Sequence, residues 1–175
     1  MTMAGLKKEK EMELVVLARS AGIGRVLPSP HKPPAVVGDA YRPEIDLYIE
    51  GVERSTKFYQ HLRSRFGRDF ATVAIEIQGE PSRKHRMGDL INAALNADVG
   101  LVVCGTDKER EQCERIARYV RHYNLLGDRP LPLILTEEEF MELLRDVESS
   151  PRKPSKWWSP NTPIEHLVDK RLKNK

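Results

Sequence analysis

The chain has 175 residues, of which 39% are hydrophobic and 31% are charged, and its formal net charge at pH 7 is +3. This length suits one domain with a substantial core and leaves little room for a second. No apolar run approaches the roughly 20 residues of a membrane span, and charges begin at Lys7, so we expect neither membrane association nor a secretory signal. Cys104 and Cys113 lack metal-binding or redox-motif spacing, so we expect a reducing, cytoplasmic setting.

The positive charge is concentrated at the C-terminal end. Residues 147–175 carry seven Lys or Arg against three Asp or Glu, a net charge of +4, which leaves −1 for residues 1–146. Four prolines surround Trp157 and Trp158 in this segment. We predict a domain over 1–146 and a basic tail over 147–175, and a basic tail on a neutral body is compatible with a nucleic-acid partner.

The chain begins with a predicted helix over residues 7–20, which Gly22 ends. Glu11 lies one turn before Leu14 and so extends the apolar stripe of this helix. An acid on a buried stripe is a candidate functional group, although an acid in a first helical turn also favours the helix dipole. A short strand over 23–27 and a proline-rich loop from Pro28 follow.

Two strands are predicted over residues 42–50 and 70–79, and each has one apolar and one polar face. In the first strand Asp46 lies on the polar face, and in the second Glu76 and Gln78 do. The two strands can pair with their acidic faces together. Residues 52–68, between them, read as an amphipathic helix or a long hairpin excursion.

A further helix is predicted over residues 82–96, with Ser82 as its N-cap. Cations are disfavoured at a helix N-terminus, where backbone amides already present a positive potential. The first turn nevertheless holds a cluster of basic residues, which indicates an anion nearby: Arg83, Lys84, His85 and Arg86.

The remaining chain alternates strands and helices. The apolar run over 99–104 predicts a central strand covered on both sides. Capping boxes at Thr106 and Thr136 open two helices, and a short strand over 131–135 lies between them. The order predicts an α/β fold, with a mixed central β-sheet flanked by helices on both faces.

The acids of the two half-polar strands are candidate metal ligands. Magnesium (Mg²⁺) takes oxygen ligands, and Asp46 and Glu76 on paired strands can share one ion, with the carbonyl of Ile77 as a third ligand and manganese (Mn²⁺) as a possible substitute. Gln78 can orient a bound water but cannot act as a base. The alternative is that both acids are ordinary solvent-facing strand residues.

These motifs resemble those of the PD-(D/E)XK nuclease superfamily, whose signature is an acid near the start of one strand and Glu-x-Lys at the end of the next. Pro43-Glu44-Ile45-Asp46 corresponds to the first element and Glu76-Ile77-Gln78 to the second. The N-terminal part is similar to archaeal Holliday junction resolvases, in which a glutamate on the first helix precedes a glycine-hydrophobic turn, as Glu11 does here. The resemblance covers about residues 7–104.

The resemblance implies a restriction endonuclease-like core and a Mg²⁺-dependent DNA endonuclease that hydrolyses phosphodiester bonds, acting on duplex or branched DNA as a homodimer. Its metal ligands would be Asp46, Glu76 and Glu11, with Glu44 as the alternative to Asp46. Phosphate contacts would come from the basic helix start, namely Arg83, Lys84, His85 and Arg86.

The sequence departs from the family at its lysine, which is replaced by Gln78. Either Gln78 itself or Lys84 would then serve near the attacking water, or the protein keeps the fold without the chemistry and binds nucleic acid or acts as a scaffold. A small-molecule-binding α/β protein built around residues 99–123 is a third hypothesis. It lacks support, because no glycine-rich phosphate-binding motif follows any strand.

Overall fold

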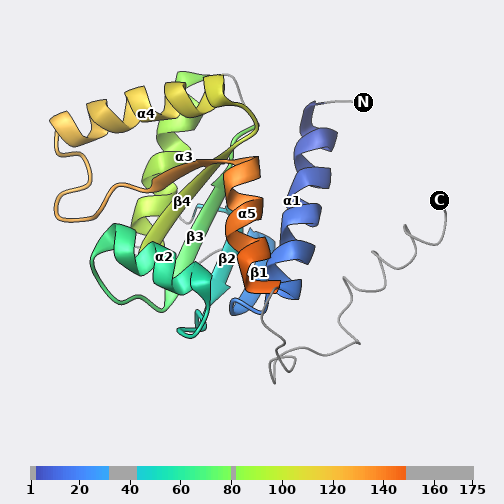
Figure 1. Cartoon of the computed structure of the whole chain (residues 1–175). Coiled ribbons are helices and arrows are strands. Elements are labelled where there is room, and N and C mark those ends of the chain that lie inside the picture. Colours follow the sequence, from blue (N-terminus) through green and yellow to red (C-terminus); the bar gives the residue numbers. More distant parts are fainter. Residues whose placement is uncertain (1–2, 32–42, 80–81, 149–175) are drawn as a thin grey trace.

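The computed structural model describes residues 3–31, 43–79 and 82–148. The predicted basic tail with Trp157 and Trp158, and most of the predicted proline-rich loop, lie outside this part of the chain. Its helices and strands follow one another in this order (Figure 1): α1 (Met3–Ser20), β1 (Arg25–His31), β2 (Ile45–Glu50), α2 (Lys57–Phe66), β3 (Thr72–Ile77), α3 (Arg83–Leu95), β4 (Val99–Cys104), α4 (Asp107–His122), β5 (Leu133–Thr136) and α5 (Glu137–Glu148).

The five strands form one mixed sheet in the order β1-β2-β3-β4-β5. The β1–β2 and β2–β3 pairs are antiparallel, whereas β3–β4 and β4–β5 are parallel. The carboxyl ends of β3, β4 and β5 therefore lie at the same edge of the sheet as the start of β2. We call this edge, marked by Asp46, Ile77 and Cys104, the carboxyl edge, and the opposite one, marked by Glu50, Thr72 and Val99, the amino edge. The predicted α/β fold with a mixed sheet between helices is confirmed.

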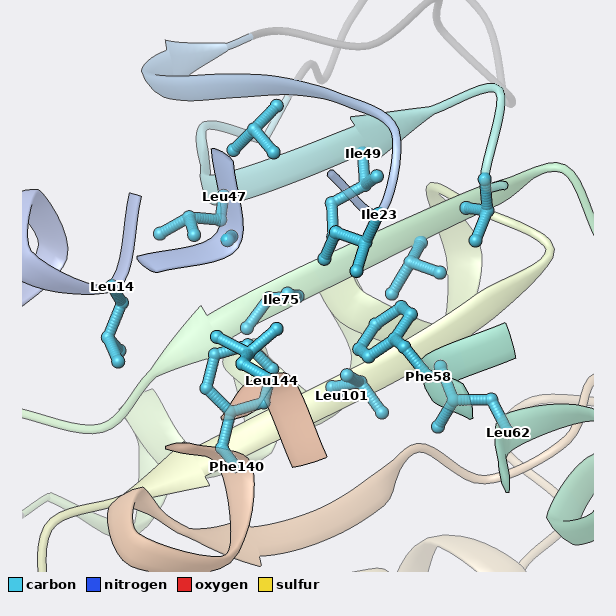
Figure 2. Close-up of a cluster of buried hydrophobic side chains, with 14 of the residues drawn as sticks. Leu14, Ile23, Leu47, Ile49, Phe58, Leu62, Ile75, Leu101, Phe140 and Leu144 are labelled. Carbon is cyan, nitrogen blue, oxygen red and sulfur yellow. The ribbon is translucent and has the colours of Figure 1, made fainter. Parts of the chain in front are cut away.

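One face of the sheet forms the larger core. Leu47, Ile49 and Ile75 pack there against Leu14 of α1 and Phe140 of α5 (Figure 2). The α2 helix adds Phe58 and Leu62 to the same cluster. Complete burial of side chains of this size stabilises a fold by roughly 1.5–3 kcal/mol each, so this face supplies most of the hydrophobic stabilisation.

Helices α3 and α4 cover the opposite face. Val102 and Cys104 of β4 pack there against Leu90 of α3 and Cys113 of α4. Gly100 allows the close approach of α3, because a Cβ at this position would lie 2.6 Å from the carbonyl oxygen of Ala93. This contact fixes how α3 sits over the strands and therefore which of its residues reach the carboxyl edge.

Local capping explains where several helices begin. The capping box at Thr136 is reciprocal, since Glu139 N donates to Thr136 Oγ1 at 3.2 Å and Thr136 N donates to Glu139 Oε2 at 2.8 Å. At Thr106 the hydroxyl accepts from Glu109 N at 3.2 Å. Ser82 occupies the N-cap position of α3 as predicted, but its side chain makes no capping hydrogen bond.

One predicted strand is longer in the structure, and one prediction with two alternatives is decided. The first strand does not end at Leu27 but continues as β1 to His31, with a shift of register after Pro28. A proline is tolerated because β1 is an edge strand of the described sheet, where a missing N–H breaks no ladder on the open side. Between β2 and β3 the chain forms the helical alternative of the two predicted, α2.

Candidate functional site

The candidate site begins with two acids on neighbouring strands at the carboxyl edge. Leu47 pairs with Ile75 in the β2–β3 register, and continuing that register by one residue sets Asp46 opposite Glu76. Both side chains therefore leave the sheet on the face that α3 covers. Asp46 is 8% exposed and Glu76 is 3% exposed. The alternative prediction, that both acids are ordinary solvent-facing strand residues, is therefore wrong. Carboxylates buried to this extent are costly unless hydrogen bonds, cations or metal ions compensate.

The carboxylate of Asp46 is held against the end of β3. Its Oδ2 accepts a hydrogen bond from the backbone N–H of Ile77 at 2.8 Å. Because this donor belongs to the residue that follows Glu76, the bond sets the carboxylate of Asp46 beside the β3 segment that carries Glu76. This hydrogen bond fixes the position of the Asp46 carboxylate at the carboxyl edge.

Gln78 is the third buried polar residue at this edge, with an exposed fraction of 6%. Its backbone N–H donates to Val103 O at 2.8 Å, which extends the contact between β3 and β4. Its side-chain Nε2 donates to Asp89 Oδ2 of α3. Within the described part of the chain, the buried Oε1 of Gln78 accepts no hydrogen bond. A buried acceptor left in this state costs about 1–3 kcal/mol, so this oxygen is suited to a water, a metal ion or a substrate group.

Asp89 is a site residue that the sequence prediction missed. It lies one helical turn after His85, on the same face of α3, and its carboxylate fixes the amide of Gln78. The available signal was an acid directly before the buried Leu90, in a helix whose other inward positions are mostly apolar. That signal does not reveal the partner, which depends on how α3 is rotated over β3.

The basic residues of the first turn of α3 differ in burial and in the groups that they face. Arg86 is buried, with 6% of its surface exposed, and its positive charge acts on the thiols of Cys104 and Cys113. Lys84 is exposed and, together with Arg83 and Arg86, lines a cavity between α3 and α4. None of Asp46, Glu76 and Gln78 is among the described residues that line this cavity. The structure thus brings Lys84 toward α4, whereas His85 shares the helix face of Asp89.

The other predicted acids, Glu11 and Glu44, are less buried than this pair. Glu11 is half-buried on α1, whose inward residue Leu14 packs on the opposite face of the sheet. Glu44 is exposed just before β2. Among residues 3–31, 43–79 and 82–148, no three His, Cys, Asp or Glu side chains are grouped closely enough to hold a metal ion.

The donor set at the carboxyl edge still fits a hard cation. It offers two buried carboxylates, from Asp46 and Glu76, and the amide oxygen of Gln78. Protein-bound Mg²⁺ commonly uses one or two carboxylates and completes its shell with waters and substrate phosphates. The absence of any sulfur or imidazole ligand in this set favours magnesium or manganese over zinc.

The two cysteines form a buried contact behind the site. Cys104 Sγ donates to Cys113 Sγ at 3.7 Å, and both side chains are fully buried. This hydrogen bond and burial together raise the pKa of Cys104 well above its usual value. Since the thiolate is the reactive form of cysteine, Cys104 is a packing residue of β4.

No protein-family model, curated protein or solved structure matches the chain. Within the described residues, no helix is both long and apolar enough to span a bilayer. The resemblance to nucleases therefore depends on the strand motifs, and the function has to be argued from the site.

Proposed function

We propose that this protein is a metal-dependent DNA endonuclease that hydrolyses phosphodiester bonds, with Asp46 and Glu76 as its ligands for Mg²⁺. The observation that carries the proposal is the pair of buried carboxylates on adjacent strands, next to a buried amide oxygen that accepts no hydrogen bond from the described residues. A bound divalent ion supplies a more acidic water and stabilises negative charge on the phosphate. The restriction endonuclease-like core and the relation to the PD-(D/E)XK superfamily belong to the same proposal.

Each residue of the site has a distinct role in this proposal. The carboxylates of Asp46 and Glu76 provide the negative charge that attracts the cation. Gln78, oriented by Asp89, places an amide oxygen where it can accept a hydrogen bond from the attacking water or bind the cation. His85, exposed on the face of α3 that also carries Asp89, supplies an imidazole that can contact a bound phosphate.

DNA would approach over the first turn of α3. Arg83, Lys84 and His85 are exposed there, and cations on one surface favour a phosphate backbone. Cutting both strands of a duplex requires two sites, so a homodimer is part of the proposed working form.

A second candidate function follows from Gln78. This residue stands where the resembling family has its lysine, it is uncharged, and its Nε2 is engaged by Asp89. The alternative is therefore a catalytically degenerate protein of this fold that binds nucleic acid or acts as a scaffold.

A plasmid-nicking assay with Mg²⁺ and with Mn²⁺ separates the two functions. The variants are Glu76→Gln, which removes the charge at nearly constant volume, and Glu138→Gln, a matched control at an exposed acid of α5. We expect the wild type and Glu138→Gln to nick supercoiled DNA and Glu76→Gln to be inactive. The nuclease proposal fails if the wild type binds DNA without cutting it, or if Glu76→Gln cuts equally well.

A further inference from the structure

The cavity between α3 and α4 is a second candidate site, separate from the acids of the carboxyl edge. It has a volume of about 670 Å³, within the range of about 300–1,000 Å³ that small-molecule sites occupy. Met87 of α3 and Ile116 of α4 supply apolar surface in its wall. The cavity is therefore large enough to receive one nucleotide unit.

The charge of this cavity has one sign. Arg83, Lys84 and Arg86 from α3 and Arg115 from α4 line it, and no Asp or Glu is among the described residues that do so. Arg115 forms an ion pair with Glu111 at 3.9 Å, between side chains that are 64% and 68% exposed. Such an exposed pair contributes little and is readily exchanged. A ligand with repeated negative charges fits the three exposed cations of this set, Arg83, Lys84 and Arg115.

Aromatic rings continue from the cavity along α4. Tyr119 lines the cavity, is 52% exposed, and contacts Tyr123 with ring centroids 4.6 Å apart. Tyr123 is 58% exposed and meets His122 edge to face. The exposed large hydrophobic side chains of the described chain are these two tyrosines and Leu125, all at the end of α4. Stacking platforms beside cations are the arrangement with which proteins bind single strands.

We propose that the α3–α4 cavity binds single-stranded nucleic acid, with phosphates on Arg83, Lys84 and Arg115 and a base stacked on Tyr119. A duplex presents its phosphates but keeps its bases stacked inside, so it cannot use the tyrosine ring. An acidic peptide could use the cations but has no planar ring at each charged unit. DNA and RNA share the chemistry that the cavity recognises.

The position of the cavity also suggests which substrates the proposed nuclease would take. Arg83 and Lys84 in the cavity and Asp89 at the carboxyl edge belong to the same helix, on different faces of it. A single strand bound in the cavity would lie next to the carboxyl edge, so the substrate would be DNA with an unpaired arm. This last step depends on the proposed function, whereas strand binding does not.

The test measures binding of labelled oligothymidylate to the full chain by fluorescence anisotropy, in excess EDTA so that no cleavage occurs. Base stacking contributes about 1–3 kcal/mol, so Tyr119→Ala should weaken binding about tenfold, while Tyr119→Phe, which keeps the ring, should bind like the wild type. Arg115→Ala should weaken binding and reduce the salt slope by about 0.7. Arg118→Ala removes an exposed charge from α4 outside the cavity and is the matched control, with a smaller effect.

Four further probes decide the ligand: oligouridylate, an abasic strand, a duplex and polyglutamate. Oligouridylate tests whether RNA binds with the same dependence on Tyr119, which the proposal allows. An abasic strand has no base to stack, so wild type and Tyr119→Ala should bind it with equal affinity.

The proposal is overturned if Tyr119→Ala and Arg115→Ala bind oligothymidylate like the wild type, provided that thermal unfolding shows both variants to be folded. It is also overturned if a duplex depends equally on Tyr119, or if polyglutamate competes equally at matched ionic strength. Since no cleavage is measured, failure of the nuclease proposal leaves these outcomes unaffected.

Discussion

The two edges of the sheet hold polar side chains whose hydrogen bonding differs. At the amino edge, Asp98 is exposed, yet its Oδ2 accepts hydrogen bonds from Ala71 N at 2.9 Å and from the N–H and hydroxyl of Thr72 at 3.0 Å each. At the carboxyl edge, Gln78 is buried beside Asp46 and Glu76, and its Oε1 accepts nothing within the described chain. The acceptor at the amino edge is satisfied by protein neighbours, whereas the amide oxygen at the carboxyl edge is not. We therefore expect Asp98 to matter for stability and, under the proposed function, the carboxyl edge to matter for cleavage.

The largest expected effect is on function. Asp46→Asn removes a charge from the carboxyl edge but keeps an oxygen that can accept the Ile77 N–H. We expect metal-dependent DNA cleavage to fall by about 100-fold or more, which corresponds to about 2.7 kcal/mol of transition-state stabilisation, with a free energy of unfolding equal to that of the wild type or higher. Plasmid nicking and urea denaturation measure the two quantities. If Asp46→Asn lost much of its stability but still cleaved DNA, the acid of the carboxyl edge would be structural and not functional.

The next effect is on stability. Asp98→Ala leaves three donors from Ala71 and Thr72 without their acceptor. We expect the free energy of unfolding to fall by about 1–2 kcal/mol, since these groups can partly turn to water, and cleavage at a temperature where the variant is folded to be unchanged. Asp128→Ala, at an exposed acid of the turn after α4, is the control and should change neither. If Asp98→Ala is as stable as the control, the hydrogen bonds to Asp98 do not stabilise the fold.

Gln78→Lys is a change at the carboxyl edge that should raise activity instead of lowering it. The ammonium group would reach toward Asp89, the present partner of the amide, and would supply the charge that the PD-(D/E)XK pattern has at this position. We expect about a tenfold gain in nicking rate, less than the roughly 10²–10⁴-fold that a well-positioned general acid–base group contributes. A folded variant that still binds DNA and shows no gain would indicate that Gln78 itself is the functional residue or that the site is degenerate.

The smallest expected effect concerns pH. Burial raises the pKa of Asp98, but hydrogen bonds from Ala71 and Thr72 and the charge of Arg68 outweigh it and hold that pKa below its usual value. The resulting stabilisation is present above the unfolded-state pKa, about 3.9, and is lost as the pH falls through the lower folded-state pKa. The difference in unfolding free energy between wild type and Asp98→Asn should therefore shrink on acidification in urea titrations. A difference independent of pH would exclude this origin.

Much of the fold could be predicted because local chemistry determines it. Alternation over residues 42–50 and 70–79 indicated two strands, although both faces of each are buried and not one alone. The capping boxes at Thr106 and Thr136 marked two helix starts. The extension of β1 beyond Pro28 could not be predicted, since it depends on that strand lying at an edge of the sheet.

The site could be predicted only where it lies on strands. Register fixed Asp46 and Glu76 on one face, but the partners from α3 depend on the rotation of that helix, which the Gly100–Ala93 contact helps to set. The sequence therefore could not show that Lys84 faces the α3–α4 cavity while His85 shares the helix face of Asp89. Nor could it show that Asp89 accepts a hydrogen bond from Gln78. Glu11 shows the same limit, because its stripe was identifiable but not the sheet face on which α1 packs.

The central claim is that the acids of the carboxyl edge bind a divalent cation, and a crystal soaked in Mn²⁺ tests it most directly. The account predicts an anomalous peak within coordinating distance, about 2.0–2.3 Å, of carboxylate oxygens of both Asp46 and Glu76, and no such peak in Glu76→Gln. A fully soaked crystal with this position empty, or with manganese bound only elsewhere, would contradict it.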